Sequence, residues 1–214
     1  NADLPSEKTL KSELAEAQKL PDGDEKTNNV TTIQASLDFL QQIQTQQKNN
    51  NDLQDTLIDA DSEIQKNSAD LQNLKKQLSS PNNTDYASQS LATLQAQLEK
   101  LTNQQQETQA SLSAVNTQLA GQSSVSERAQ TALTDNVKRT QVLNQQLNDP
   151  AISALLKQQI QLELQLIELK NAYNQILLKN SDQFTVLYQS RYDLLNTRVQ
   201  AQQKQIAAIQ EAIN

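Results

Sequence analysis

The chain contains no cysteine, histidine, methionine or tryptophan among its 214 residues, and it has only two glycines and four prolines. Without cysteine and histidine it has no thiol nucleophile, no disulfide, no Cys/His zinc site and no side chain that ordinarily titrates near neutrality. Few glycines and prolines leave little material for strands joined by tight turns. These absences exclude most enzyme mechanisms and predict long helices with few connections.

The charge of the chain is modest and leans to one sign. Its 25 acidic and 18 basic residues give a formal net charge of −7, and residues 1–80 carry 14 of the acidic residues and 8 of the basic ones. Such a surface repels phosphate backbones and anionic lipid headgroups, so we expect no nucleic-acid partner and no direct binding to a membrane surface. No stretch approaches the ~20 apolar residues that cross a bilayer.

Apolar residues recur with a strict heptad period in LATLQAQLEKLTNQQQETQASLSAVNTQLAG, residues 91–121. A stripe with a period of about 3.5 faces a partner helix, so the segment is predicted to form a coiled-coil helix. Gly121 follows the last apolar position and is predicted to close this helix in the left-handed conformation. The seam consists of Leu91, Leu94, Leu98, Leu101, Gln105, Thr108, Leu112, Val115 and Leu119.

Two helices are predicted before this segment. Ser6 caps a short helix that runs to about Leu20, where Pro21-Asp22-Gly23 ends it. A long helix covers about residues 28–79, and we expect it to continue through the polar stretch KNNND, which places Asn50 on an otherwise apolar seam.

Three helices are predicted after it. Residues 124–127, SVSE, have the spacing of a capping box, and Asp149-Pro150 supplies an N-cap followed by a proline suited to the first helical position. Residues 179–182, KNSD, form a turn with Ser181 or Asp182 as the cap of the last helix. The first of these three helices is carried by Val125, Ala129, Ala132, Leu133, Val137, Leu143 and Leu147.

The helix that starts near Pro150 has two apolar stripes and is therefore predicted to pack between two neighbours as the most buried element. One stripe consists of Ile152, Leu155, Gln159, Leu162, Leu166, Leu169, Tyr173 and Ile176. The other is formed by Leu156, Ile160, Ile167 and Leu177.

The predicted fold class is all-α: an elongated antiparallel coiled coil or helical bundle of about six helices, several of them very long. Residues 79–85, SSPNNTD, are the turn of a long hairpin over about 25–120, and a second helical unit covers about 124–214. Residues 3–214 are expected to form a single elongated domain. Residues 1–2 are interpreted as a cloning scar, because the chain starts with Asn-Ala and not with methionine.

Acidic, aromatic and amide side chains are the candidate sites in this sequence. An acidic face consists of Asp52, Asp55, Asp59 and Glu63; it lacks the glycine and the glutamate of a calcium loop, so a solvated face is favoured. An aromatic set, with Arg191 and Arg198 nearby, is interpreted as core packing and consists of Phe184, Tyr188 and Tyr192. Polar layers that set register are predicted at Gln105, Thr108, Gln159 and Gln202. We therefore assign no catalytic residue, no cofactor, no metal site and no small-molecule substrate.

Three segments together resemble a known family. LPSEKTLKSELAEAQKL (4–20), LNDPAISALLKQQIQLELQLIELKNAYNQ (147–175) and RYDLLNTRVQAQQKQIAAIQEAIN (191–214) are similar to the N-terminal periplasmic region of the large MscS-type mechanosensitive channels, called the MscS porin domain. Channels of the MscK and MscM kinds carry this region. The resemblance extends over nearly the whole chain and brings no functional residue with it.

The resemblance implies a non-catalytic periplasmic domain of an inner-membrane channel in a Gram-negative bacterium. Its expected role is structural, oligomerising or gating-modulating, and its expected partners are other subunits of the same channel and envelope components. The alternative is a periplasmic coiled-coil scaffold or adaptor of an envelope or export complex. A chain of amide-rich helices with narrow apolar seams suits either role, because it extends into water without a large apolar patch.

Overall fold

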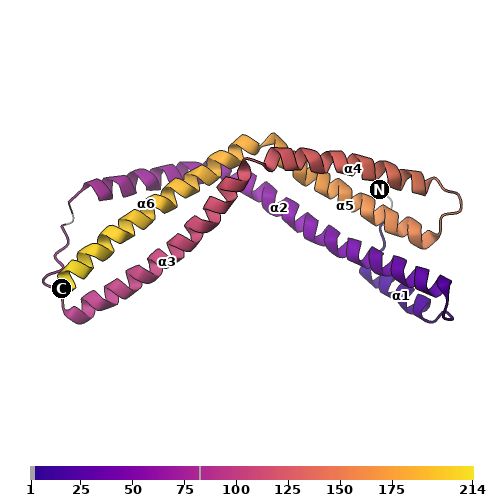
Figure 1. Cartoon of the computed structure of the whole chain (residues 1–214), viewed down its shortest axis with the longest axis horizontal. Helices are drawn as coiled ribbons and strands as arrows, with labels where there is room; N and C mark the ends of the chain where they lie inside the picture. The colour runs from indigo at the N-terminus through magenta and orange to yellow at the C-terminus, as the bar shows by residue number, and fades with distance from the viewer. Residues whose placement is uncertain (1–2, 82) are drawn as a thin grey trace. The chain divides into compact units, whose positions relative to one another are not determined.

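The computed structural model describes residues 3–81 and 83–214, and these residues form six α-helices and no β-strand (Figure 1). The predicted all-α fold of about six helices is confirmed. The predicted cloning scar, residues 1–2, lies outside the described residues. The helices are α1 (Glu7–Gln18), α2 (Asp24–Ser79), α3 (Leu91–Gln122), α4 (Val125–Leu147), α5 (Ala154–Lys179) and α6 (Ser181–Ile213).

The long second helix is continuous, as predicted. α2 has 56 residues and passes through the polar stretch around Asn50 without a break. At ~1.5 Å per residue it is about 84 Å long. It begins at Asp24, four residues before the predicted start, and Asp24 and Glu25 place negative charge at the positive end of the helix dipole.

The short first helix also starts where the sequence predicts. Ser6 is its N-cap, and the Ser6 hydroxyl accepts a hydrogen bond from the backbone N–H of Thr9 at 3.1 Å. The heptad helix α3 begins in the same way, because Ser90 accepts from the backbone N–H of Thr93 at 3.2 Å. Each serine satisfies a backbone donor that has no partner inside the helix.

The prediction that Gly121 closes α3 in the left-handed conformation is wrong. α3 continues to Gln122, and among the described residues the only positive φ is that of Gly23, at 155°. The Gly121 carbonyl accepts hydrogen bonds from the backbone N–H and from the hydroxyl of Ser124, both at 3.2 Å. Because this right-handed turn occupies the carbonyl at the helix end, no left-handed residue is needed before α4 begins at Val125.

The fifth helix begins later than predicted, at Ala154 and not at Pro150. The Asp149 carboxylate accepts from the backbone N–H of Ala151 at 2.9 Å and folds this stretch into a turn. Aspartate and proline at the first two positions of a turn both favour this outcome. Ser153 is the cap instead, because its hydroxyl accepts a backbone N–H of the first helical turn at 3.1 Å.

The predicted turn before the last helix is shorter than expected. A single residue, Asn180, separates α5 from α6, and its carbonyl accepts from the backbone N–H of Phe184 at 3.1 Å. Ser181 and Asp182, the two predicted caps, are already helical. The N-cap position belongs to Asn180, which makes no side-chain capping hydrogen bond.

The chain divides into two compact units, and each unit draws on two separate stretches. The first unit takes the chain up to Thr56 together with Val125–Lys179, and the second takes Leu57–Ser124 together with Asn180–Asn214. In the second unit α3 packs along α6. The predicted hairpin over about 25–120 pairs α3 with the helix before it, and it stays a prediction.

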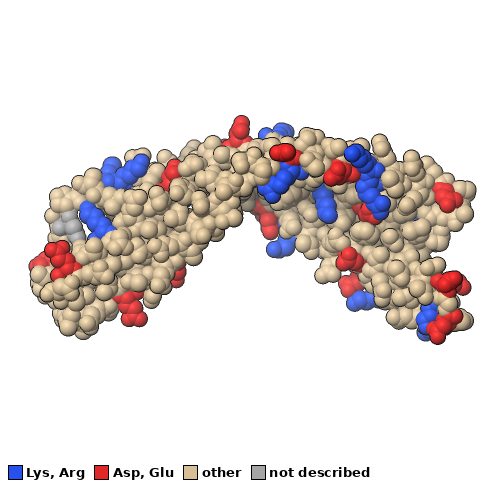
Figure 2. Space-filling model, viewed as in Figure 1, with Lys and Arg blue, Asp and Glu red and all other residues tan. Residues whose placement is uncertain are grey.

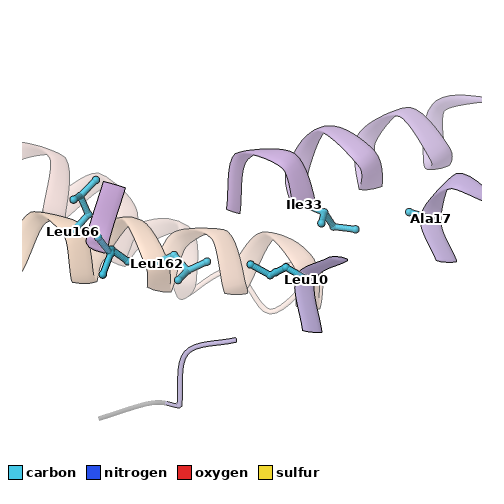
Figure 3. Close-up of a cluster of buried hydrophobic side chains, with 6 residues drawn as sticks. Leu10, Ala17, Ile33, Leu162 and Leu166 are labelled. Carbon is cyan, nitrogen blue, oxygen red and sulfur yellow. The ribbon is translucent and has the colours of Figure 1, made fainter. Parts of the chain in front are cut away.

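In the first unit, α5 lies between two groups of helices, as its two stripes predict. Leu162 and Leu166 share a buried cluster with residues of α1 and α2 (Figure 3). Ile160 and Ile167 share another with Leu143 of α4. Ile160 and Leu162 are only two residues apart and yet pack against different helices, because successive residues of a helix point in different directions.

In the second unit, the buried apolar side chains of α3 and α6 are aliphatic except for one aromatic ring near the start of α6. Leu91, the first predicted seam residue of α3, is 55% exposed, because it lies in the first turn of the helix. The buried apolar residues of these two helices are Leu94, Val115, Phe184, Leu187, Leu194, Ile206 and Ile209.

The central place of α5 predicts a large effect of one truncation. Leu162→Ala should lower the free energy of unfolding by about 2–5 kcal/mol, because Leu162 is 0% exposed and its loss leaves a cavity. Val137→Ala on α4 is the matched control; Val137 is 56% exposed, so its change should stay within about 0.5 kcal/mol. Urea unfolding followed by circular dichroism measures both, and equal effects would contradict the packing described here.

Candidate functional site

A connected set of polar side chains joins α2 to α6 in the second unit. Asn67, which is 8% exposed, donates its side-chain amide to Glu63 Oε2 at 3.3 Å and to Ser190 Oγ at 3.2 Å. Ser190 donates in turn to the carbonyl of Leu187 at 2.7 Å. Arg191 binds both carboxylate oxygens of Glu63, with Nε at 2.5 Å and Nη2 at 2.8 Å. Two residues one turn apart on α2 therefore hold two neighbouring residues of α6.

Aromatic rings extend this set along α6. Phe184 is 1% exposed, and its ring lies 6.3 Å from that of the half-buried Tyr188, with 25° between the ring planes. The guanidinium carbon of Arg191 lies 5.8 Å from the centre of the Tyr188 ring. The predicted core packing is confirmed for Phe184. The arginine that could have met a ligand is engaged by Glu63 and Tyr188 inside the chain.

The pairing changes the protonation behaviour of both partners. The hydrogen bond from Arg191 lowers the pKa of Glu63 below its ordinary value of 4.5, and this effect exceeds the opposing effect of partial burial. The same hydrogen bond raises the pKa of Arg191. The pair is therefore ionised at neutral pH, and its planar two-point geometry ties α2 and α6 together in one orientation.

The predicted polar layer on α3 meets matching amides on α6. Gln105 donates to Gln203 Oε1 at 3.0 Å and to the carbonyl of Val199 at 3.4 Å. Gln202 donates to Thr108 Oγ1 at 3.1 Å, and Thr108 is 8% exposed. The structure thus brings three of the four predicted layer residues into the α3–α6 seam, in direct contact with one another or with the facing helix. These hydrogen bonds reward one alignment of the two helices over others.

In the first unit, Asn50 of the α2 seam also forms a hydrogen bond to a neighbouring helix. Asn50 is 7% exposed and donates to the carbonyl of Leu169 on α5 at 2.9 Å, while its oxygen accepts from Gln46 at 2.9 Å. The fourth predicted layer residue, Gln159 of α5, is half-buried. Asn50 thus supplies a directional contact in a seam whose other members are mostly aliphatic.

The predicted place of Val137 in the α4 seam is wrong. Asn136 faces α5 instead and donates to Asn171 Oδ1 at 2.8 Å. The buried residues Ala129 and Leu143 lie seven residues before and after Asn136, so Asn136 belongs to their heptad column and Val137 points one residue away from it.

A second bidentate ion pair joins α4 to α5. Arg139 binds Glu163 with Nε at 2.6 Å and Nη2 at 2.8 Å. This hydrogen bond raises the pKa of Arg139. The Arg139 side chain is 48% exposed and the Glu163 side chain 12%, so solvent partly screens this pair, as it does the pair in the second unit.

The four residues of the predicted acidic face do not come together at one site. Glu63 turns to Arg191, Asp52 forms an exposed ion pair with Lys48 at 3.6 Å, and Asp55 and Asp59 are exposed. Within residues 3–81 and 83–214, no three side chains of the metal-binding kinds come together in a group that could hold an ion. Charged residues on the face shown in Figure 2 are scattered, with uncharged surface between them.

A hollow of about 570 Å³ lies where α2 ends beside α6. Lys204 occupies part of its wall and donates to the carbonyls of Leu78 and Ser80 at 3.0 and 3.1 Å. Lysine at this place satisfies carbonyls that the helix end leaves open. The hollow is lined by Lys76, Gln77, Leu78, Ser80, Pro81, Asn83, Thr84, Ala201, Lys204 and Gln205, a set without any carboxylate to act as a general base.

Two contacts of the α2–α6 set were missed from the sequence. Asn67 lies three residues after Ile64, in the second column of the α2 heptad, which also holds Ala60 and Leu74. That column was the available signal for a buried asparagine. The pairing of Glu63 with Arg191 had no local signal, because 128 residues separate the two.

These contacts define a class of protein: a long-helix bundle whose interior polar groups connect helices to one another. No helix in the described part of the chain combines the length and the apolar composition that a membrane crossing requires. A profile of the mechanosensitive ion channel porin domain matches residues 13–214. The chain therefore belongs to the MscS porin domain family, which associates it with MscS-type mechanosensitive channels and confirms the resemblance seen in the sequence.

A relative supports the same assignment. The chain is 56% identical over 211 residues to an MscS family protein of Haemophilus influenzae. This alignment covers 99% of the chain and 19% of the relative, so the chain spans about a fifth of the relative's length. No solved structure matches the chain.

The Glu63–Arg191 pair predicts a specific acid sensitivity. Because the pKa of Glu63 is lowered on folding, its stabilisation is present above the unfolded value near 4.5 and is lost as the pH falls through the folded value. Glu63→Gln should therefore reduce the drop in melting temperature between about pH 5 and pH 3, and should cost roughly 1 kcal/mol at pH 7, a value discounted for partial exposure.

Glu107→Gln on the exposed surface of α3 is the matched control, because it removes the same charge without touching the Glu63–Arg191 pair. Thermal melts recorded by circular dichroism across this range measure the effect. A Glu63→Gln profile parallel to that of the parent would show that the pair contributes nothing to acid sensitivity.

Proposed function

We propose that the chain is a non-catalytic periplasmic extension of an MscS-type mechanosensitive ion channel of the MscK or MscM kind. The observation that carries the proposal is the family match over residues 13–214. Its role is structural, oligomerising or gating-modulating, and its partners are other subunits of the same channel and components of the envelope. The family is one of channel domains, which supports a non-enzymatic role.

The surfaces of the helices support an extension and not a pore. Most apolar side chains lie in narrow seams between helices, whereas amide and charged side chains make up most of the remaining faces. Lipid offers no hydrogen bonds to polar groups, so such faces are unstable against hydrocarbon. We therefore place the segment in water and the membrane-spanning helices in other parts of the parent protein. The relative is about five times as long as the matched region, so it has room for such helices.

Two kinds of extension would affect gating differently. A passive spacer binds nothing whose contacts change on opening, and it leaves the opening tension unaltered. A tether binds an envelope component more tightly in one state of the channel than in the other, and only such a difference shifts the equilibrium between the states. The hydrogen-bonded seams give a tether the rigidity it needs, because they oppose sliding of one helix along another.

Deleting residues 3–214 from the parent protein should leave a channel that still opens under tension. The reason is that the tension-bearing elements are the membrane helices. Patch-clamp recording in native envelope and in plain liposomes measures the opening tension of the full-length and shortened proteins. A tether predicts a changed threshold in native envelope alone, and a spacer predicts none in either setting.

The isolated segment is the control for the pore. It should give no conductance in planar bilayers, because its outer faces are polar. Single-channel currents from the segment alone, or a shortened channel that reaches the membrane yet never opens, would overturn the proposal.

The periplasmic location has its own test. Because the segment lacks cysteine, Val137→Cys introduces a single thiol into it at an exposed site on α4. In a parent protein freed of other cysteines, a membrane-impermeant maleimide should label this thiol in cells whose outer membrane alone is permeable. Labelling only after lysis of the inner membrane would place the segment in the cytoplasm. A cysteine in a known cytoplasmic protein of the same cells is the control.

The export scaffold remains the alternative reading of long periplasmic helices. The family match favours the channel, because it names channel domains over nearly the whole chain. A parent gene without membrane-spanning segments after this region would support the scaffold and remove the channel.

A further inference from the structure

The buried apolar residues of the first helix belong to a single cluster. Leu10 is 0% and Ala17 is 5% exposed, and both belong to the cluster that contains Ile33 of α2 and Leu162 and Leu166 of α5. Figure 3 shows Leu10 pointing toward Leu162 and Ala17 lying across from Ile33. α1 therefore covers the apolar faces that α2 and α5 present on one side of the first unit.

The polar contact of α1 with α5 is incomplete. Gln158 donates its side-chain amide to Glu13 Oε1 at 3.2 Å. The other oxygens of this pair, Glu13 Oε2 and Gln158 Oε1, are both buried, and no side chain or backbone group among the described residues donates to them. Buried acceptors without donors weaken an interface, because each one gave up water on docking. The hydrogen bond between Gln158 and Glu13 thus favours docking of α1, whereas the two unpaired oxygens of the same residues oppose it.

The length and the attachment of α1 add to this weakness. With 12 residues it is the shortest of the six helices described, and isolated helices shorter than about 12–15 residues are marginal in water. Its link to α2 ends at Gly23, whose φ of 155° lies in a region that residues with side chains rarely adopt. A Cβ at Gly23 would meet nothing within 4 Å, so the glycine serves the backbone conformation and not a close contact.

We propose that α1 is a releasable strap, which docks on α2 and α5 and detaches from them while the rest of the first unit stays folded. Release uncovers Ile33, Leu162 and Leu166, which α1 otherwise shields from water. α5 is retained because its second stripe, with Ile160 and Ile167, still packs against α4. The free energy needed to detach α1 is therefore smaller than the free energy needed to unfold the rest of the first unit.

Hydrogen exchange of the whole chain, followed by mass spectrometry, tests the strap without any substitution. Backbone amides of α1 should exchange at least about tenfold faster than those of α5 around Leu162, because they open in a local step and not in global unfolding. Equal protection of the two helices would overturn the proposal.

Paired variants test the cause. Gln158→Leu alone removes the donor to Glu13 and should speed exchange in α1. Glu13→Leu combined with Gln158→Leu removes the buried oxygens together with their donor and should slow exchange in α1 by about tenfold, toward the rate in α5.

Glu16→Leu on the exposed face of α1 is the matched control for the changed charge and helix propensity, and it should leave exchange in α1 within about twofold of the parent. Circular dichroism checks that each variant keeps its helix content. A double variant whose α1 exchanges as fast as that of the parent would show that the unpaired oxygens do not loosen the helix, and would overturn the proposal.

Discussion

The narrow apolar seam is the constraint on which the rest of this structure depends. In residues 3–81 and 83–214 the buried apolar side chains lie in narrow columns of Leu, Ile, Val and Ala between helices, as the two clusters of the first unit illustrate. In a thin core each buried side chain contributes a large share of the total stability, because few other side chains are buried. α5 supports two such seams at once, with Leu162 on one and Ile160 on the other, and so connects more of the first unit than any other helix described.

Thin aliphatic seams have a weakness that the buried polar groups address. A heptad repeat fits its partner nearly as well after a shift of seven residues, because one Leu replaces another. Asn50 and Asn67 interrupt the repeat on α2, and each donates to a particular group of the facing helix. The bidentate pair of Glu63 with Arg191 adds an oriented charge contact beside Asn67. These groups supply alignment where the aliphatic contacts supply burial.

The same organisation relates to the proposed place of the segment in a channel. Helices with thin seams and amide-rich outer faces extend far into water with little material, since each residue of helix adds about 1.5 Å. The buried polar contacts between helices oppose sliding when force acts along the segment. The proposed release of α1 is then the local step that occurs first. The family match associates the chain with mechanosensitive channels, and the packing supports the mechanical role that we propose for it.

The sequence by itself determined the helices, some of their ends and the family. Heptad spacing, the Ser6 cap and the scarcity of glycine are local signals, and local signals suffice for local structure. The misjudged ends at Gly121 and Pro150 were decided by turns in which Ser124 and Asp149 bond the backbone, a competition that propensity alone does not resolve.

Only the tertiary structure decided which seam meets which. α3 packs along α6, which lies far from it in the sequence, and Glu63 meets a partner 128 residues away. A heptad stripe states that a helix needs a partner, but Leu and Ile side chains fit many partners almost equally. The choice therefore rests on the sum of burial and polar contacts over the whole chain, which no single segment contains.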